Sequence, residues 1–505
     1  MRGTGTIGVR VTDTELPRHD PLDLYVQLRE LLPAQDVFLF ESVDGADQDR
    51  RSAVVGFGRL AEIRVFDGRV EIDGVGAVAL ALEQAAGALG MTAGESAGPG
   101  VHSLRFAGTD QMWGLLSRAQ GLFAVDTRVP STSYAFGFLT TLAYESAWHM
   151  EELPDRTKEP RGPDITLTLF RDTVWYDLTS GQVRQLSAEG AAFGDAAVPV
   201  GVADLARQAA SVTPAQGSTP AVPEAPAPLS VHDSVSRETF LDWADRCLEH
   251  IRVGDIYQIQ IGHRIDVRST LTPVEVYRRL RGRNPSPYMY LMPRAGSTLI
   301  GASPELFFRI EGDTIEMRPI AGTARRGPDE EENQRRIKEM RESTKEQAEH
   351  IMLVDLCRND IGRVTRPSTQ PVDRLMAVES FSHVFHLVST VAGRLQDGVD
   401  TWQAVRATFP AGTMTGAPKV RAMEIIDGLE EQRRGSYAGA VGLVDVRGWS
   451  ELALCIRTIE YDGSTYSTQS SAGMVAQSEP AAEWRETLAK MGAAYWALTG
   501  EELLS

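Results

Sequence analysis

Two segments of the sequence carry acidic side chains at the spacing of one helix face. Glu346 and Glu349 lie three residues apart in a helix-like stretch, and Glu483, Glu486 and Lys490 repeat this pattern in a second stretch. Residues three, four or seven positions apart share one face of an α-helix. Two such faces that meet offer the all-oxygen environment that Mg²⁺ prefers. The alternative for each pair is an ordinary solvated face, since Glu and Lys are mostly exposed.

A second group of segments is suited to binding a small dianion. FPAGTMTGAPKVRAM places Gly416 just before a predicted helix whose first turn holds Pro418, where backbone N–H groups point at an anion. Arg457 ends the strand-like LALCIRT, and Ser471 and Gly473 allow close approach to the backbone of the next strand. Each feature has a simpler alternative, because glycines usually only form turns and a single arginine is commonly a surface ion pair.

Helices and hairpin-like strands must position these residues. The periodicities predict helices over Leu22–Leu32, Asp329–Leu356 and Pro480–Leu498, and strands over Ser52–Phe66, Arg69–Ile72, Ile256–Ile265, Met289–Met292, Ala438–Val446 and Leu452–Ile459. The strands do not alternate regularly with helices as in a doubly wound sheet. We therefore expect an α/β protein of the layered α+β kind, with antiparallel sheets.

The composition excludes several classes of protein. The 505 residues include 51 basic and 69 acidic side chains, a formal charge of −18, which argues against nucleic acid or a membrane surface as partner. No apolar run of about 18 residues predicts a membrane helix, and the N-terminus does not resemble a signal peptide. Cys247, Cys357 and Cys455 are too scattered for a disulfide framework. We expect a cytoplasmic protein.

A proline-rich and alanine-rich run divides the chain. The sequence VTPAQGSTPAVPEAPAP cannot bury enough apolar surface to fold by itself. We therefore expect an N-terminal region over 1–211, a linker or loop over 212–229 and a catalytic region over 230–505.

Eight motifs of the second region occur in the order typical of one family. GDIYQ, NPSPYMY, GASPELF, PIAGTARRG, EHIMLVDLCRND, HLVSTVAG, FPAGTMTGAPKVRAMEII and YAGAVG resemble the chorismate-utilising enzymes, namely the large component of anthranilate synthase and its relatives. LFESVDG extends the resemblance more thinly into the first region. The resemblance implies two stacked antiparallel sheets flanked by helices. It also implies a Mg²⁺ ion held chiefly by Glu349 and Glu486, with Glu346 and Glu483 close behind.

The family's substrate, chorismate, carries a ring carboxylate and an enolpyruvyl carboxylate. By resemblance, Mg²⁺ and the backbone around Gly473 bind the ring carboxylate, with Ser471 beside it and Lys490 near the metal. Tyr437 and Arg457 would hold the enolpyruvyl carboxylate, and Gly416 belongs to the anion-binding segment.

The family displaces the C4 hydroxyl of chorismate, and hydroxide is a poor leaving group. Glu305 of SPELF matches the family's general acid, and a carboxyl beside other carboxylates has a raised pKa that keeps it protonated. Thr323 of PIAGT and His386 of HLVS complete the implied site. A lone histidine is more often structural, so only the surrounding motif supports the role of His386.

Two positions distinguish the branches of the family. Gln258 stands where the water-using relatives carry a lysine that activates water, and a glutamine cannot act as a general base. Ala321 stands where the branch that aminates C4 often carries a nucleophilic lysine, so no amine is available there. The remaining reaction is attack of ammonia at C2. Amination at C4 stays an alternative, as does a non-catalytic homologue.

The product depends on whether pyruvate is then eliminated. Anthranilate synthases carry QAGAGIVADS where this chain reads QSSAGMVAQS, so Ser471 replaces a glycine and Gln477 replaces an acid. Because misplacement by about an ångström can cost about 10²-fold in rate, the added hydroxymethyl group favours retention of the pyruvyl group. This reaction gives 2-amino-4-deoxychorismate, as in the antibiotic pathways of secondary metabolism. Full conversion to anthranilate is the main alternative.

Two further expectations concern partners and regulation. No cysteine lies on the glycine-flanked turn of a class I glutaminase, so a separate glutaminase subunit is expected to supply ammonia. LFESVDG and NPSPYMY resemble the tryptophan inhibitor pocket of anthranilate synthase, or alternatively serve packing between domains. The residues concerned are Glu41, Ser42, Pro287, Tyr288 and Met289.

Overall fold

The computed structural model describes residues 6–95, 97–194, 201–212, 222–367, 371–381 and 384–504. The first region contains the strands β1 (Ile7–Leu16), β2 (Val37–Glu41), β3 (Ser52–Phe66), β4 (Arg69–Gly74), β5 (Thr92–Ala93), β6 (His102–Arg105), β7 (Phe123–Thr127), β8 (Gly137–Leu142), β9 (Ile165–Asp177) and β10 (Val183–Glu189). Its helices are α1 (Pro21–Leu31), α2 (Gly76–Gly87), α3 (Thr109–Gln120) and α4 (Val202–Val212).

The second region continues with the strands β11 (Ser230–Asp233), β12 (Gln258–Arg268), β13 (Tyr288–Arg294), β14 (Ser297–Ser303), β15 (Leu306–Glu311), β16 (Thr314–Met317), β17 (Ile320–Arg325), β18 (Val372–Ser380), β19 (Val384–Arg394), β20 (Gly416–Ala417), β21 (Ala440–Asp445), β22 (Ser450–Leu454), β23 (Thr458–Tyr461) and β24 (Tyr466–Met474). Its helices are α5 (Arg237–Arg252), α6 (Pro273–Arg283), α7 (Glu330–Glu342), α8 (Thr344–Gly362), α9 (Thr401–Thr408), α10 (Lys419–Leu429) and α11 (Pro480–Thr499).

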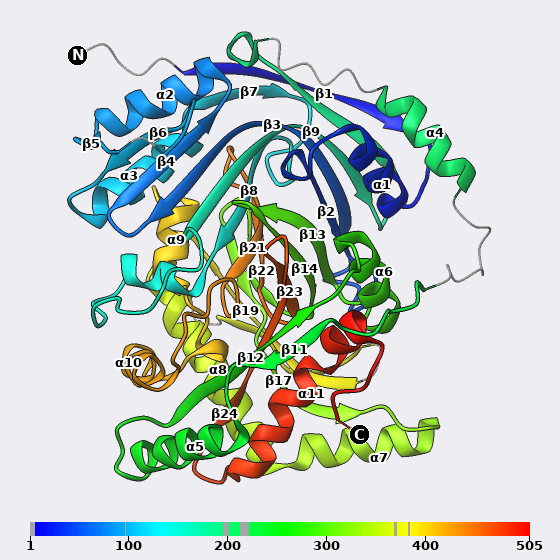
Figure 1. Cartoon of the computed structure of the whole chain (residues 1–505), viewed down its shortest axis with the longest axis vertical. Coiled ribbons are helices and arrows are strands. Elements are labelled where there is room, and N and C mark those ends of the chain that lie inside the picture. The colour runs from blue at the N-terminus through cyan, green and yellow to red at the C-terminus, as the bar shows by residue number, and fades with distance from the viewer. Residues whose placement is uncertain are drawn as a thin grey trace.

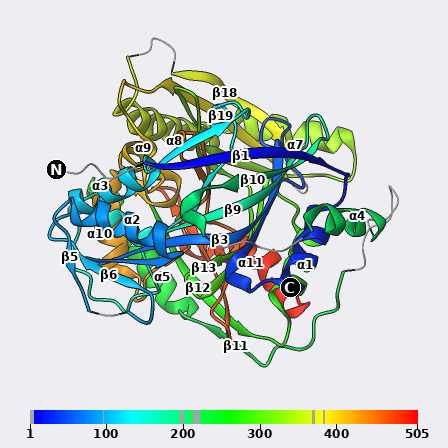
Figure 2. The same cartoon turned by 90° about the horizontal axis from the view of Figure 1, so that it is seen from above.

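The strands pair almost entirely in antiparallel fashion, which confirms the expected fold class. Among the described strands only β1 and β7 run parallel. The long N-terminal strands arch over the strands of the second region, and helices cover the outside (Figures 1 and 2). Hydrogen bonds between β2 and β13 and between β8 and β21 cross from one region to the other, so the described strands form one continuous network.

The predicted linker lies partly outside the described residues, because 213–221 are not among them. On either side of it, a large apolar core draws on both regions and includes Phe38 and Phe138 from the first region with Phe308 and Trp402 from the second. The two regions therefore share a core.

No helix in the described ranges has both the length and the apolar character needed to cross a bilayer.

Two predicted elements were wrong in extent. The helix expected over Asp329–Leu356 is two helices, because Ser343 ends α7 and its hydroxyl accepts the amide N–H of Glu346 at 3.3 Å to begin α8. The strand expected over Leu452–Ile459 is interrupted at Arg457, whose φ of 51° lies in the left-handed region. Both interruptions occur next to residues of the site described below.

Candidate active site

A cavity of about 360 Å³ lies between the sheet and helices α8 and α11. It is lined by every predicted catalytic and metal residue and by all but one of the predicted substrate residues. These residues are Gln258, Glu305, Ala321, Thr323, Glu346, Glu349, His386, Tyr437, Arg457, Ser471, Gly473, Glu483, Glu486 and Lys490. Side chains from distant parts of the sequence therefore meet in one place, as predicted.

The acidic faces of α8 and α11 turn toward this cavity. Burial raises the pKa of Glu349, and the charges of Glu346 and Glu486 raise it further. The pKa of Glu483 is likewise raised by burial and by Glu486, although the hydroxyl of Ser478 opposes the shift. Carboxylates that raise each other's pKa are close enough to repel, and a bound cation relieves this repulsion.

These residues fit Mg²⁺ as a shared site with few protein ligands. Within the described ranges, no three acidic, histidine or cysteine side chains lie close enough together to hold a metal by themselves. Lys490 Nζ lies 2.7 Å from Glu486 Oε1, so one of the four carboxylates is already in an ion pair. Mg²⁺ commonly uses one or two carboxylates, several waters and an anionic substrate, so the donor set suits it. Its binding here remains a prediction.

Glu305 has the properties of a proton donor. It follows the end of β14, where the hydroxyl of Ser303 accepts its backbone N–H at 3.3 Å. Burial raises the pKa of Glu305 to about 8, against the opposing effects of the Thr413 hydroxyl, the Ile320 backbone and the charge of Lys490. A carboxyl group with this pKa is mostly protonated at neutral pH and can protonate a leaving oxygen.

His386 lies on β19 opposite Thr323 of β17. Its Nδ1 atom is 3.1 Å from the backbone oxygen of Gly322 and 3.1 Å from the Thr323 hydroxyl. Because a carbonyl oxygen only accepts, this contact assigns the proton to Nδ1 and leaves Nε2 with the lone pair. Burial, supported by the charge of Arg457, lowers the pKa of His386 to about 4, so the ring is neutral at pH 7.

Ser471 connects the groups predicted to bind the two carboxylates of the substrate. Its hydroxyl donates to Gln260 Oε1 at 2.9 Å and lies 2.6 Å from the Tyr437 hydroxyl. Since Ser471 gives its proton to Gln260, Tyr437 donates to Ser471. Lys490 Nζ donates to the backbone oxygen of Ser471 at 2.9 Å. Ser471 therefore fixes the positions of three side chains that line the cavity.

Gly473 of β24 lies opposite Gln260 of β12, and the side-chain amide of Gln258 is also close to it. A Cβ atom on Gly473 would lie 2.9 Å from Gln260 Nε2 and 3.3 Å from Gln258 Nε2, so any side chain there would displace these amides. Gln258 is 1% exposed, and its amide oxygen finds no hydrogen-bond partner among the described residues. An unpaired buried acceptor that lines a cavity is available to a ligand that donates.

Arg457 brings a cation to the same cavity. The described residues include no ion-pair partner for it, and burial lowers the pKa of its guanidinium despite the nearby Tyr437 and Glu486. A desolvated cation without a partner favours an anionic ligand. This arrangement supports the expected contact with a carboxylate.

Gly416 is not among the residues that line the cavity, so nothing in the cavity supports its predicted contact with the substrate. A Cβ atom on Gly416 would lie 2.3 Å from the backbone oxygen of Gln258, and its φ of 157° also disfavours a side chain. The glycine instead allows β20 to pack against β12. No residue of α10 is among the lining residues. Helix α10 begins at Lys419, so Pro418 caps it rather than lying in its first turn.

Sequence reasoning missed two lining residues with clear roles in the geometry. Thr413 follows Gly412 in the segment predicted to bind an anion, and its hydroxyl lowers the pKa of Glu305 against the effect of burial. Gln260 lies two residues after Gln258 on the same strand, and alternate residues of a strand point to the same face. This alternation is the signal that would have revealed Gln260.

The five residues of the predicted inhibitor pocket line a second, much smaller cavity of about 40 Å³. They are Glu41, Ser42, Pro287, Tyr288 and Met289. The aromatic rings of Trp175 and Trp449 pack edge to face in its wall. The five residues thus lie together, whereas the inhibitor pocket itself and any ligand for this cavity remain predictions.

Comparisons with known proteins agree with these observations. Residues 89–495 match the family described as chorismate binding enzyme. The chain is 46% identical to the 2-amino-4-deoxychorismate synthase of Streptomyces globisporus over 99% of this chain and 98% of that protein. It is 42% identical to anthranilate synthase component 1 of Streptomyces coelicolor over 70% of this chain and 71% of that protein. The crystal structure of anthranilate synthase component I from Streptococcus pneumoniae aligns with a TM-score of 0.66 at 26% identity, covering 88% of this chain and 92% of that one.

Proposed function

The chain belongs to the family of chorismate-binding enzymes, and from this premise we propose that it aminates chorismate at C2 and releases 2-amino-4-deoxychorismate. Ammonia is the nucleophile and Mg²⁺ the cofactor. The enolpyruvyl group is retained. The match to the Streptomyces globisporus enzyme over nearly the whole of both chains supports this product.

The observation that carries the choice of nucleophile is the pair Gln258 and Ala321 in the wall of the large cavity. A glutamine cannot remove a proton from water, and an alanine cannot form a covalent intermediate. The unpaired amide oxygen of Gln258 can instead accept a hydrogen bond from ammonia. Lys490, a nearby amine, is occupied by Ser471 and Glu486.

In the proposed reaction a C2–N bond forms while the C4–O bond breaks. Glu305 gives its proton to the departing C4 oxygen, which leaves as water. The proton that ammonia loses passes to solvent. Arg457 and Tyr437 hold the enolpyruvyl carboxylate, and the backbone at Gly473 approaches the ring carboxylate. Glu349 and Glu486 would hold Mg²⁺, which would supply positive charge to the ring carboxylate. His386, neutral at pH 7 with Thr323 beside it, would lie near the leaving oxygen in the proposed pose.

Retention of the enolpyruvyl group is supported by the contacts of Ser471. Its hydroxyl donates to Gln260 and accepts from Tyr437, so the Tyr437 hydroxyl is engaged on the side toward Gln260. This changes the surroundings of the enolpyruvyl carboxylate, which leaves the ring during elimination. The alternative product is anthranilate. The 42% identity to the Streptomyces coelicolor enzyme favours that alternative, although the match covers 70% of this chain.

We further propose that a separate glutaminase supplies the ammonia. A glutaminase nucleophile must be a thiolate, yet burial raises the pKa of Cys247 and of Cys455 to about 12 and raises that of Cys357 further. All three cysteines are buried. None of them is suited to attack glutamine.

One incubation tests the proposal. The purified protein is mixed with chorismate, Mg²⁺ and ammonium, and the products are followed by mass spectrometry and pyruvate assay. We expect an aminated product that keeps its three-carbon side chain, with proton spectra placing nitrogen at C2. Anthranilate with stoichiometric pyruvate would contradict the retained side chain. Equal use of glutamine and ammonium by the protein alone would contradict the separate glutaminase.

A further inference from the structure

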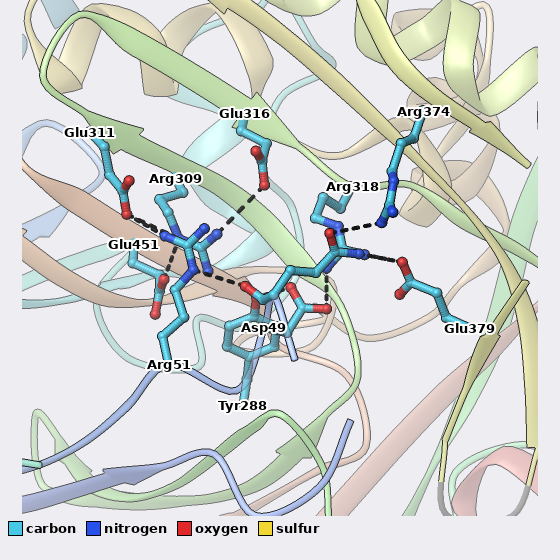
Figure 3. A network of polar contacts seen from close by, with 11 residues as sticks. Asp49, Arg51, Tyr288, Arg309, Glu311, Glu316, Arg318, Arg374, Glu379 and Glu451 are labelled. Carbon is cyan, nitrogen blue, oxygen red and sulfur yellow. Dashed lines mark hydrogen bonds and ion pairs between the residues drawn. The ribbon is translucent and has the colours of Figure 1, made fainter. Parts of the chain in front are cut away.

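A buried chain of polar contacts links the wall of the small cavity to the strands of the active site. At its centre is Arg318, which is 2% exposed and forms ion pairs with Asp49 on one side and Glu379 on the other. The distance from Arg318 Nη2 to Glu379 Oε1 is 2.6 Å. Figure 3 shows the Arg318 side chain between these two carboxylates. The three residues come from parts of the chain that are far apart in sequence.

The position of Arg318 gives its contacts a consequence for the active site. It lies between β16, which ends at Met317, and β17, which begins at Ile320. Both strands pair with β19. The first four residues of β17 line the large cavity, and Thr323 among them contacts His386. An anchor at Arg318 therefore fixes the start of a strand that forms the cavity wall.

Glu379 extends this anchor to the other side of His386. It lies on β18 directly opposite His386 of β19, while Thr323 of β17 lies opposite the same histidine on its other flank. The Arg318–Glu379 ion pair thus ties together the two strands between which the histidine strand runs. The ring of Phe381, just after β18, also packs against His386 at 5.0 Å between ring centroids.

Asp49 connects the anchor to the small cavity. It is 5% exposed and accepts a hydrogen bond from the Tyr288 hydroxyl at 2.9 Å, in addition to its ion pair with Arg318. Tyr288 is one of the residues that line the small cavity. The ring of Tyr288 lies beside Asp49 in Figure 3. The chain of contacts therefore runs from Tyr288 through Asp49 and Arg318 to Glu379.

We propose that Arg318 is a positioning residue for the reaction. Through its ion pairs it holds the strands that carry Thr323 and His386 in place, and because Asp49 also bonds Tyr288, their placement depends on Tyr288 in the wall of the small cavity. The inference rests on the proposed function only in giving Thr323 and His386 a part in catalysis.

The neighbouring Arg309 cluster provides a matched control. Arg51 and Glu311 form an ion pair at 2.5 Å in the network of Figure 3, but Glu311 points to Arg309 and Arg51 and not to β18. Its side chain is 39% exposed. Exposed pairs of this kind contribute little to stability. Glu311→Gln therefore removes a carboxylate from the network without touching the route to His386.

The experiment compares Asp49→Asn, Glu379→Gln and Tyr288→Phe with Glu311→Gln in the full-length protein. The first readout is the titration of the His386 ring by NMR, assigned by the signal lost in His386→Asn. Loosening of the strands admits water, so the pKa of His386 should rise from about 4 toward its ordinary 6.5 in the first three variants. In Glu311→Gln it should stay at the wild-type value.

The second readout is the rate at which chorismate is consumed with ammonium, whatever the product. We expect kcat to fall about tenfold in Asp49→Asn and Glu379→Gln, and about threefold in Tyr288→Phe, with KM nearly unchanged, because small displacements of catalytic groups have effects of this order. The double variant Asp49→Asn with Glu379→Gln should lose about tenfold rather than a hundredfold, since both changes act through Arg318.

Three results would overturn the inference. These are an unchanged His386 titration in the folded variants, additive losses in the double variant, or a Tyr288→Phe protein that behaves as wild type. Thermal unfolding and circular dichroism identify any variant that has merely lost its fold. Such a variant is replaced by Arg318→Lys, which keeps the charge but not the two-sided contact, and the His386 titration is then measured in Arg318→Lys. The ring titration needs no substrate, so it remains informative even if the proposed product proves wrong.

Discussion

The two cavities of this protein are both lined by carboxylates, but the carboxylates differ in their partners. In the small cavity Glu41 accepts hydrogen bonds from Tyr277 and is paired with Arg281 at 2.8 Å, and Glu451 is paired with Arg309 at 2.5 Å. In the large cavity, neither Glu346 nor Glu349 has an ion-pair partner within the described part of the chain. Charges that the protein pairs internally stabilise its structure, whereas charges that it leaves unpaired are available to a ligand.

The cavities also differ in size: the large cavity has a volume of about 360 Å³ and the small one about 40 Å³. The smaller volume holds only a few water molecules, since one water needs about 10–15 Å³ by this measure. The larger volume suits a small diacid with its metal. The comparison predicts that changes in the large cavity affect catalysis most, and that changes to the paired carboxylates of the small cavity affect stability first.

Substitution of Glu305 should give the largest effect on the reaction. Glu305→Gln removes the proton donor but keeps the shape of the side chain, so we expect kcat to fall about 10³-fold, within the range of general acid catalysis. Stability should change little, because the buried group is already uncharged at neutral pH.

The matched control lies in the other cavity. Glu41→Gln should leave amination with ammonium nearly unchanged, yet lower the free energy of unfolding by about 2 kcal/mol, because the buried side chain loses its charge-assisted contacts with Arg281 and Tyr277, while Arg281 keeps its ion pair with Asp20. Rates and urea unfolding of both variants test the pair. Equal losses of activity would remove the functional distinction between the two cavities.

Removal of a metal carboxylate should weaken Mg²⁺ binding. Glu349→Gln and Glu486→Gln should each lower the affinity for Mg²⁺ in the presence of chorismate by at least about tenfold, the effect of disturbing even an outer group of a metal site. Calorimetry measures this directly, with Asp355→Asn on the exposed side of α8 as control. Unchanged Mg²⁺ affinity in both variants would show that the acidic faces do not hold the ion.

The pH dependence of the rate should report Glu305. The pKa of this group is raised to about 8, so the protonated form that donates is present below pH 8 and is lost above it. With rates expressed per concentration of free ammonia, kcat should fall about tenfold per pH unit above this value. A flat profile up to pH 10 would mean that Glu305 is not the donor.

Much of the large cavity could be predicted from local patterns. Glu346 and Glu349 were found because helix periodicity fixes which residues share a face. Periodicity gave no sign that α8 begins at Thr344, after a cap at Ser343. The sequence does contain that signal, since Ser343 and Glu346 have the spacing of a capping box.

The missed features depend on contacts between distant strands. Gly416 has the sequence of an anion-binding turn, and only the pairing of β20 with β12 shows that its missing side chain makes room for the backbone of Gln258. The same is true of Arg318, which precedes the motif PIAGT and shows no pattern of its own. Its two ion pairs join residues separated by the greater part of the chain.

Ser471 should control the product more than the rate. Ser471→Gly frees the hydroxyl of Tyr437 and restores the glycine of the anthranilate synthase pattern. We expect the fraction of chorismate converted to anthranilate and pyruvate to rise by about tenfold, while total consumption changes less, since a displacement well below an ångström is enough for this effect. Product ratios measured by fluorescence and pyruvate assay decide it. A product ratio equal to that of the wild type would exclude Ser471 as the determinant.

Tryptophan should have the smallest effect, because the small cavity, at about 40 Å³, is too small for an indole ring. Trp175 and Trp449 already occupy its apolar wall, and the carboxylate of Glu41, which could receive an amino group, is held by Arg281. An indole ring enters only if these side chains move, at a cost comparable to that of disrupting a packed core. We expect saturating tryptophan to change the amination rate by less than about twofold, or less than about 0.5 kcal/mol. Inhibition beyond about tenfold would instead mean that this cavity opens to admit an amino acid.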